Sequence, residues 1–200
     1  ALTYYHKNGD LNAGRTVGDA NMNRFVYSAY NIALLQVLTA YPDILPLSVR
    51  DRWLNTVHQT AEYQIETFGT INILQPHGAG YYANMDCCYT AMMEAAGKLL
   101  DFDQYCQSAS ARSERIESYM CLDGAWPYMG YANESPTYHQ TDIHYLTYYY
   151  LMSQNPQTLS MLQKSAPYYP LTLEKNNLIE YSTTLYFKQY WDKVDPGYIE

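Results

Sequence analysis

Residues 84–100 read Asn-Met-Asp-Cys-Cys-Tyr-Thr-Ala-Met-Met-Glu-Ala-Ala-Gly-Lys-Leu-Leu. Small and apolar side chains recur in this segment at the spacing of one helix face, at Cys88, Ala91, Met92, Ala95, Ala96 and Leu99. The spacing predicts an α-helix over about 84–100. No Cys-x-x-Cys pair occurs in the chain, so Cys87 and Cys88 are expected to be small core residues rather than zinc ligands or a redox pair.

The same helical spacing continues on both sides of this segment, and no stretch shows sustained strand alternation. Ser48 is expected to cap one helix, while Ser135-Pro136 and Asn155-Pro156 each combine an N-cap residue with a proline in the first helical position. Besides 84–100, the predicted helices cover about 23–41, 48–68, 103–120, 135–152, a short segment from 155, and 172–191. The sequence therefore predicts an all-α fold.

A faint internal repeat indicates how these helices are arranged. Ala20-Asn21-Met22-Asn23 and Ala83-Asn84-Met85-Asp86 begin 63 residues apart, and each opens a predicted helix. A period of this order corresponds to one helical hairpin with its loops. We expect residues 1–200 to form a single α/α toroid-like domain, an incomplete barrel of helical hairpins or a piece of a larger chain. A plain helical bundle explains the same periodicity.

Composition narrows the function classes. The chain has 12 Lys and Arg against 20 Asp and Glu, a formal net charge of −8, and no apolar run of about 18 residues. Neither nucleic-acid binding nor membrane insertion is therefore expected. Tyr accounts for 24 aromatic residues, against 4 Phe and 3 Trp. An apolar ring with a hydroxyl suits either a core with wet edges or a groove that binds a hydroxyl-rich ligand.

The candidate chemistry lies in two long connections, about 69–83 and 121–135, which are rich in Gly, Pro, Tyr and Asn. Loops of this length in a compact domain are often functional. The second connection leads into a helix whose first turn contains Tyr138 and His139. The positive end of that helix would favour an anion, and a tyrosine hydroxyl beside an imidazole can exchange protons. The alternative is that both residues simply pack and hydrogen-bond beneath the loop.

The run Asp123-Gly124, followed by Glu134-Ser135-Pro136-Thr137-Tyr138-His139, resembles a signature in the helical toroid of heparinase-type and alginate-type polysaccharide lyases. The helix that begins at Asn84 is similar to a second conserved helix of those families. The resemblance implies that Asn84 contacts a uronate carboxylate and that Tyr138 takes part in proton transfer. Met85 stands where the family usually has His, and these residues hold no counterpart of its β-sandwich domain. The base would therefore be Tyr138, His139 or His77.

β-Elimination gives these residue types a chemical reason. The C5 proton of a uronic acid becomes acidic enough to remove only when donors such as an Asn amide or an Arg neutralise the neighbouring carboxylate. A base then takes that proton, and an acid protonates the departing glycosidic oxygen. The expected catalytic residues are Asn84, Tyr138 and His139. The expected substrate-binding residues are Arg24, His77, Tyr82, Trp126 and Tyr128. No metal or cofactor is expected.

The sequence thus predicts a lyase that cleaves an acidic polysaccharide or oligosaccharide in the periplasm or outside the cell. Two alternatives stay open. Toroids also host glycoside hydrolases, which use a carboxylate pair; the candidate carboxylates are Asp86, Asp123, Glu134 and Asp142. The chain could also be a non-catalytic helical domain that binds carbohydrate. His139 and His144 are a poor fit to metal-ligand spacing, and Asp142 between them is expected at the surface.

Overall fold

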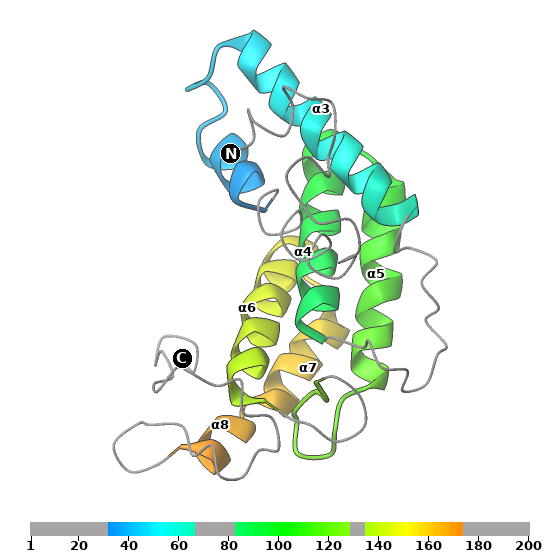
Figure 1. Cartoon of the computed structure of the whole chain (residues 1–200), viewed down its shortest axis with the longest axis vertical. Coiled ribbons are helices and arrows are strands. Elements are labelled where there is room, and N and C mark those ends of the chain that lie inside the picture. Colours follow the sequence, from blue (N-terminus) through cyan, green and yellow to red (C-terminus); the bar gives the residue numbers. More distant parts are fainter. Residues whose placement is uncertain (1–31, 67–82, 129–134, 174–200) are drawn as a thin grey trace, which may run out of the picture.

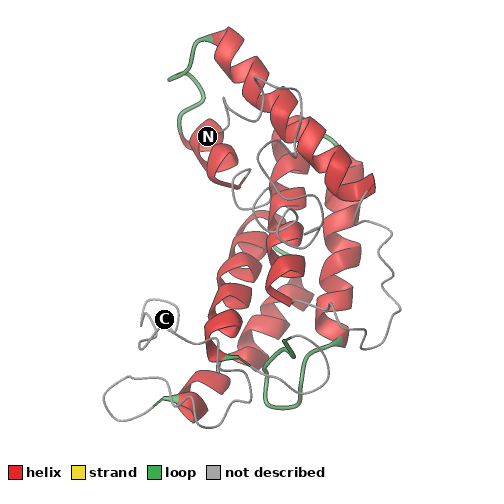
Figure 2. Ribbon diagram, in the orientation of Figure 1, coloured by secondary structure: helices red, strands yellow, loops and turns green. Residues whose placement is uncertain are grey.

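The computed structural model describes residues 32–66, 83–128 and 135–173. Its helices are a segment over 32–40, α3 (Leu47–Gln64), α4 (Ala83–Leu100), α5 (Asp103–Ser118), α6 (Pro136–Ser153), α7 (Pro156–Ser165) and α8 (Tyr168–Thr172) (Figure 1). The described ranges contain no β-strand (Figure 2). The predicted all-α class is therefore confirmed.

The bounds of α4, α5 and α6 and the start of α7 lie within two residues of the predicted ones, whereas α3 and the last predicted helix differ more. The helix predicted from Ser48 begins at Leu47 after Pro46, so Ser48 lies inside its first turn and does not cap it. Thr172, the predicted start of the last helix, is instead the final residue of α8, and Leu173 is extended. Residues 23–31 and 174–191 of two predicted helices lie outside the described part of the chain.

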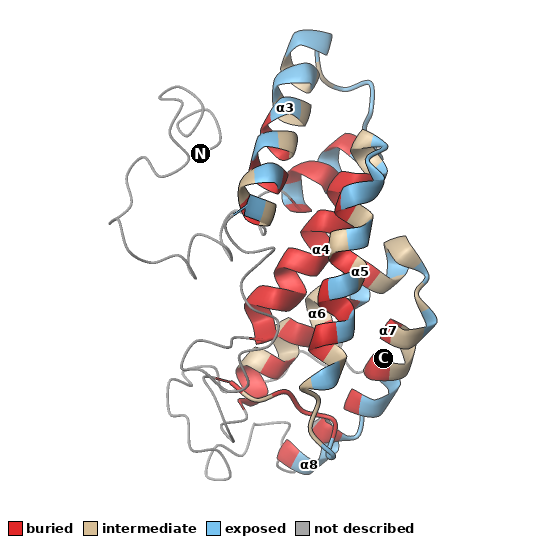
Figure 3. Ribbon diagram, turned by 90° about the vertical axis from the view of Figure 1, so that its right-hand side faces the viewer, coloured by how far each residue is buried: buried red, intermediate tan, exposed pale blue. Residues whose placement is uncertain are grey.

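Helix α4 is the central element. Fifteen of its 18 residues are buried, whereas the helices around it, α3 and α5, bury one face each (Figure 3). A helix without a wide polar face is typical of a position enclosed by other helices. Its many Ala, Cys and Met residues, with Gly97 facing α5, let the surrounding helices approach closely.

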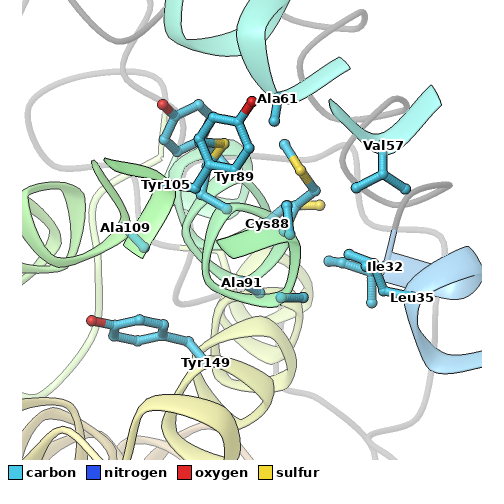
Figure 4. Close-up of a cluster of buried hydrophobic side chains, with 14 of the residues drawn as sticks. Ile32, Leu35, Val57, Ala61, Cys88, Tyr89, Ala91, Tyr105, Ala109 and Tyr149 are labelled. Atoms are coloured by element: carbon cyan, nitrogen blue, oxygen red, sulfur yellow. The ribbon is translucent and has the colours of Figure 1, made fainter. Parts of the chain in front are cut away.

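Two clusters of buried apolar side chains hold the helices together. The larger one joins residues of 32–40, α3, α4, α5 and α6, including Leu35, Val57, Met92 and Tyr105 (Figure 4). The smaller one lies around Trp126 and includes Cys87 and Ile143. Cys87 and Cys88 are fully buried free thiols, which confirms their predicted place in the core.

Several tyrosines belong to this core and reach polar partners at its edge. The ring of Tyr89 is buried, and its hydroxyl lies 2.8 Å from Ser108 Oγ. Tyr105 is likewise buried and donates to Glu62 Oε1 across 2.6 Å. These residues match the first explanation of the tyrosine excess, in which rings fill the core and hydroxyls hydrogen-bond at its margin.

Short connections fix the direction of the helices. Two residues join α4 to α5, and two join α6 to α7, so each pair forms an antiparallel hairpin (Figure 1). Asp101 and Gln154, which follow α4 and α6, both take the left-handed conformation, with φ of 54° and 53°. Helices α4 and α6 pack side by side and run parallel. No described helix is both long and apolar enough to cross a membrane.

Candidate active site

The N-terminal turns of α4 and α6 lie at the same end of the bundle because the two helices run parallel (Figure 1). Asn84 is the second residue of α4, and Tyr138 and His139 are the third and fourth residues of α6. In sequence, Asn84 precedes Tyr138 by 54 positions and His139 by 55. In the fold, the three predicted catalytic residues belong to the same end of the bundle. Both helices direct their positive dipole ends toward it.

Asn84 is almost completely buried, with 4% of its surface exposed. Its Oδ1 atom has no hydrogen-bond partner among the described residues. Buried side-chain oxygens in folded proteins nearly always have a partner. This carbonyl oxygen is therefore able to accept a hydrogen bond from a group other than those of the described residues.

Tyr138 is half-buried and stacks on Tyr128. The ring centroids are 3.8 Å apart, and the planes differ by 9°. Tyr128 belongs to the segment that follows α5, so the contact fixes the first turn of α6 against that segment. A partly exposed tyrosine whose ring is held in this way suits a group that must meet a substrate.

His139 occupies a different environment from its neighbour. Only 1% of its surface is exposed, and its ring lies 5.4 Å from that of Trp126 and 4.4 Å from that of Tyr168. Burial lowers the pKa of His139 to about 3, although the charge of Asp123 and a hydrogen bond with the Ser165 backbone act in the opposite direction. The imidazole is therefore neutral at physiological pH.

Trp126 also lies in the core. Its exposed fraction is 2%, and its indole N–H donates to the Ile116 carbonyl oxygen across 3.0 Å. A sugar could reach this ring only if the end of the bundle opened, so the stacking role of Trp126 stays a prediction, as does that of Tyr128. The other predicted substrate-binding residues, Arg24, His77 and Tyr82, lie outside the described part of the chain.

A buried ion-pair cluster supports the first turn of α4. Asp86 Oδ1 accepts from Arg112 Nη1 at 3.2 Å, and Asp86 Oδ2 lies 3.9 Å from Arg115 Nε. All three side chains are at least nine-tenths buried. Two guanidinium groups thus face one carboxylate, and these three side chains carry a net charge of +1. Neither arginine was predicted as part of the site, although their i, i+3 spacing places them on one face of α5.

Asp142 is the second buried carboxyl at this end, and its predicted surface position is wrong because only 1% of it is exposed. Burial raises the pKa of Asp142 well above its ordinary value; a hydrogen bond from Cys87 opposes this shift, and Asp86 adds to it. The pKa of the Cys87 thiol is also raised well above its usual range, first by burial and then by the charges of Asp142 and Asp86. Burial therefore favours the protonated form of Asp142 over its carboxylate.

The carboxylates that could serve a hydrolase are not arranged as an open pair. Asp86 is engaged by the two arginines, and Asp142 is enclosed. Asp123 Oδ1 accepts from the Ala125 backbone N–H at 3.1 Å, which closes a local turn. Glu134 lies outside the described residues.

Nothing in the described ranges gathers three or more His, Cys, Asp or Glu side chains in the way a metal site requires. Comparison of the chain with protein-family models, with curated proteins and with solved structures finds no match.

Proposed function

We propose that the chain is a polysaccharide lyase that cleaves a uronic-acid-containing polymer by β-elimination. The observation that carries this proposal is the position of Asn84 and Tyr138 in the first turns of two parallel, adjacent helices. A buried amide and a partly exposed phenol at one end of a fold are the two kinds of group that the reaction needs. The resemblance of residues 123–139 to lyase signatures supports the same assignment.

Each residue has a distinct role in the proposed reaction. The Asn84 amide donates to the uronate carboxylate and makes the C5 proton acidic enough to remove. Tyr138, reacting as its phenolate, takes that proton and then, as the phenol, gives it to the leaving glycosidic oxygen, which restores the phenolate. His139, which is enclosed and neutral, holds the turn of α6 rather than meeting the substrate. The positive ends of the helices favour the acidic polymer despite the net charge of −8.

We further propose that the helices form an arc of an incomplete α/α toroid. In such a fold, every second helix faces inward, and the inner helices run parallel. The nearly complete burial of α4, its parallel packing with α6, and the half-exposed α5 support this arrangement (Figure 3). A periplasmic or secreted location belongs to the same proposal, since a polymeric substrate is met outside the cytoplasm.

The experiment is an ultraviolet assay of the purified protein with a panel of polyuronates. Elimination creates an unsaturated uronate that absorbs in the ultraviolet, whereas hydrolysis of the same bond does not. We expect Tyr138→Phe to reduce the rate at least a hundredfold, within the range for loss of a general acid–base group. Tyr150→Phe is the matched control, because Tyr150 lies at the opposite end of α6. Reducing-end release without absorbance would instead identify a hydrolase, and binding without turnover a carbohydrate-binding domain.

A further inference from the structure

Two helices of this chain begin with the same local pattern, an N-cap residue followed by proline, yet only one of them is capped. Asn155 precedes α7 and accepts hydrogen bonds from the backbone N–H groups of Gln157 and Thr158, at 2.8 and 3.3 Å. Ser135 precedes α6 in an extended conformation, and its hydroxyl makes no capping bond. Serine is among the residues that cap helices most readily. The missing bond at Ser135 therefore requires a separate explanation.

The hydroxyl of Ser135 is also enclosed. The residue is 2% exposed, and its Oγ atom has no hydrogen-bond partner among the described residues. A hydroxyl can rotate to donate or to accept, so it usually finds a partner even in a crowded core. Ser135 is thus a buried polar group at the start of an 18-residue helix that neither caps that helix nor binds elsewhere in the described structure.

Asn84 provides an independent observation at the same end of the bundle. Its Oδ1 atom, in the first turn of α4, is likewise buried and without a partner in the described ranges. A carbonyl oxygen must accept a hydrogen bond, whereas a serine hydroxyl can donate one. A ligand that satisfies both atoms therefore carries at least one hydrogen-bond donor and one acceptor, and the saccharide of the proposed function supplies hydroxyl donors.

The electrostatic environment indicates which acceptor is favoured. The positive ends of α4 and α6 point to this end of the bundle, and the guanidinium groups of Arg112 and Arg115 lie close to the first turn of α4, against Asp86. Anionic oxygens bind readily at helix N-termini under such conditions. The acceptor is therefore expected to be a carboxylate, and the ligand a hydroxylated acid.

We propose that Ser135 is a substrate-binding residue whose hydroxyl donates to the carboxylate of a sugar acid at the first turn of α6. Because Ser135 Oγ and Asn84 Oδ1 are both enclosed, the sugar acid binds when this end of the bundle opens. The Asn84 amide then donates to the same carboxylate, and its Oδ1 accepts from a sugar hydroxyl. The identity of the ligand as part of a polysaccharide rests on the proposed function, whereas the recognition of a sugar acid is tested separately. In this proposal Ser135, which does not cap α6, binds the ligand instead of only preceding the helix.

The test compares the wild-type protein with three variants, Ser135→Ala, Ser135→Thr and Asn155→Ala. Each protein is titrated with sodium D-glucuronate and, separately, with D-glucose, and NMR chemical-shift changes report the binding. We expect the wild-type protein to bind glucuronate in preference to glucose. Ser135→Ala should weaken glucuronate binding about tenfold, the effect of one hydrogen bond to a charged group, with its melting temperature unchanged. Ser135→Thr, which keeps the hydroxyl, should retain most of the binding. Asn155→Ala should lower the melting temperature by several degrees because it removes a real cap, and should bind like wild type.

Three results would overturn the inference: no binding of glucuronate by the wild-type protein, equal binding of glucose, or unchanged glucuronate binding in Ser135→Ala. A fall in the melting temperature of Ser135→Ala without a change in binding would make the hydroxyl purely structural. The proposed lyase activity fails independently, through the absence of unsaturated product. If product does form, Ser135→Ala should raise KM for the polymer about tenfold with little change in kcat, and an unchanged KM would reject the role of Ser135 while leaving the lyase assignment intact.

Discussion

The ring of Tyr138 lies flat on the ring of Tyr128, with centroids 3.8 Å apart. The two residues come from different segments, the first turn of α6 and the chain that follows α5. Tyr128 is 7% exposed, whereas Tyr138 is partly open. The buried ring thus serves as a support for the ring that is proposed to carry the proton.

Replacing the support should affect both stability and rate. Tyr128→Leu keeps an apolar side chain but removes the stacked pair, so we expect a loss of about 1 kcal/mol in the free energy of unfolding. The rate of product formation should fall at least tenfold because Tyr138 is no longer held in place. Urea unfolding and the ultraviolet assay measure the two effects. Tyr128→Phe keeps the stacked ring and should resemble wild type in both measurements. If Tyr128→Leu formed product as fast as wild type, the stacking would not contribute to catalysis.

The Asp86 cluster should be sensitive to loss of its single carboxylate. Asp86→Asn removes the carboxylate that Arg112 and Arg115 both face in the buried cluster, so we expect a loss of about 3–5 kcal/mol in the free energy of unfolding. Glu114→Gln is the control, since Glu114 is an exposed acid on the same helix as the arginines. Its effect should stay within about 0.5 kcal/mol. A small effect of Asp86→Asn, measured by urea unfolding, would mean that water or another group balances the two guanidiniums.

How much of this arrangement is predictable from sequence depends on whether the cause is local. The all-α class and the start of α6 follow from periodicity and from Ser135-Pro136, which act within a few residues. The placement of Asn84 and Tyr138 at one end of the fold depends on which helices run parallel. Its prediction therefore also required the toroid hypothesis. The pairing of Asp86 with Arg112 and Arg115 was not predictable, since charged residues in a helix look the same in sequence whether they face solvent or a partner helix.

The surroundings of His139 and Asp142 show the same limit more sharply. Spacing places His139 beside Tyr138 in one helical turn, but whether it faces a substrate or the core is decided by Trp126 and Tyr168, which arrive from other segments. Asp142 lies three residues further along α6 and is enclosed by contact with α4, close to Cys87. Local patterns locate such residues on a helix, and only tertiary packing decides their exposure.

Gly97 lies where α4 and the start of α5 approach closely. A Cβ atom at this position would lie 2.4 Å from Cys106 Sγ and 3.0 Å from the Cys106 backbone nitrogen. Gly97→Ala should therefore lower the free energy of unfolding by about 1–3 kcal/mol through overpacking, even though alanine favours helix by about 1 kcal/mol. Thermal and urea unfolding measure the change.

A second substitution tests the origin of that loss. Cys106→Ala removes the sulfur that the new methyl group would meet, so it should recover part of the stability lost in Gly97→Ala; the backbone contact would remain. Strict additivity of the two substitutions would show that the helices separate instead of clashing, because residues in contact are expected to couple.

His139 should make the protein sensitive to acid. Its pKa in the folded protein is about 3, against an ordinary value of 6.5. Between these values the unfolded chain binds a proton that the folded protein does not, so stability falls as pH decreases. The contribution of His139 should reach about 2 kcal/mol between pH 6.5 and pH 5. His139→Gln removes this dependence, and an unchanged slope in urea unfolding across that range would contradict the buried neutral imidazole.

Asp142 should act in the opposite direction. Its pKa is raised in the folded protein, so the folded state keeps a proton that the unfolded chain releases above about pH 4, and stability falls as pH increases. Asp142→Asn is neutral at every pH and should therefore be more stable than wild type at pH 7, with the difference vanishing toward pH 4. Asp51→Asn, at an exposed position of α3, should change little at either pH.

Between pH 4 and pH 6.5, His139 and Asp142 change the free energy of unfolding in opposite directions as pH changes. Removing one of the two residues should therefore make the pH dependence due to the other easier to measure. Relative to wild type, His139→Gln should lose more stability as pH rises, since the contribution of Asp142 is then no longer opposed by His139. Asp142→Asn should lose more stability as pH falls, since the contribution of His139 is no longer opposed by Asp142. Urea unfolding at pH 4, 5.5 and 7 distinguishes these slopes. If both variants instead showed the same slope, the neutral forms of the two groups could not both be present in the folded core, and at least one would have to be ionised there.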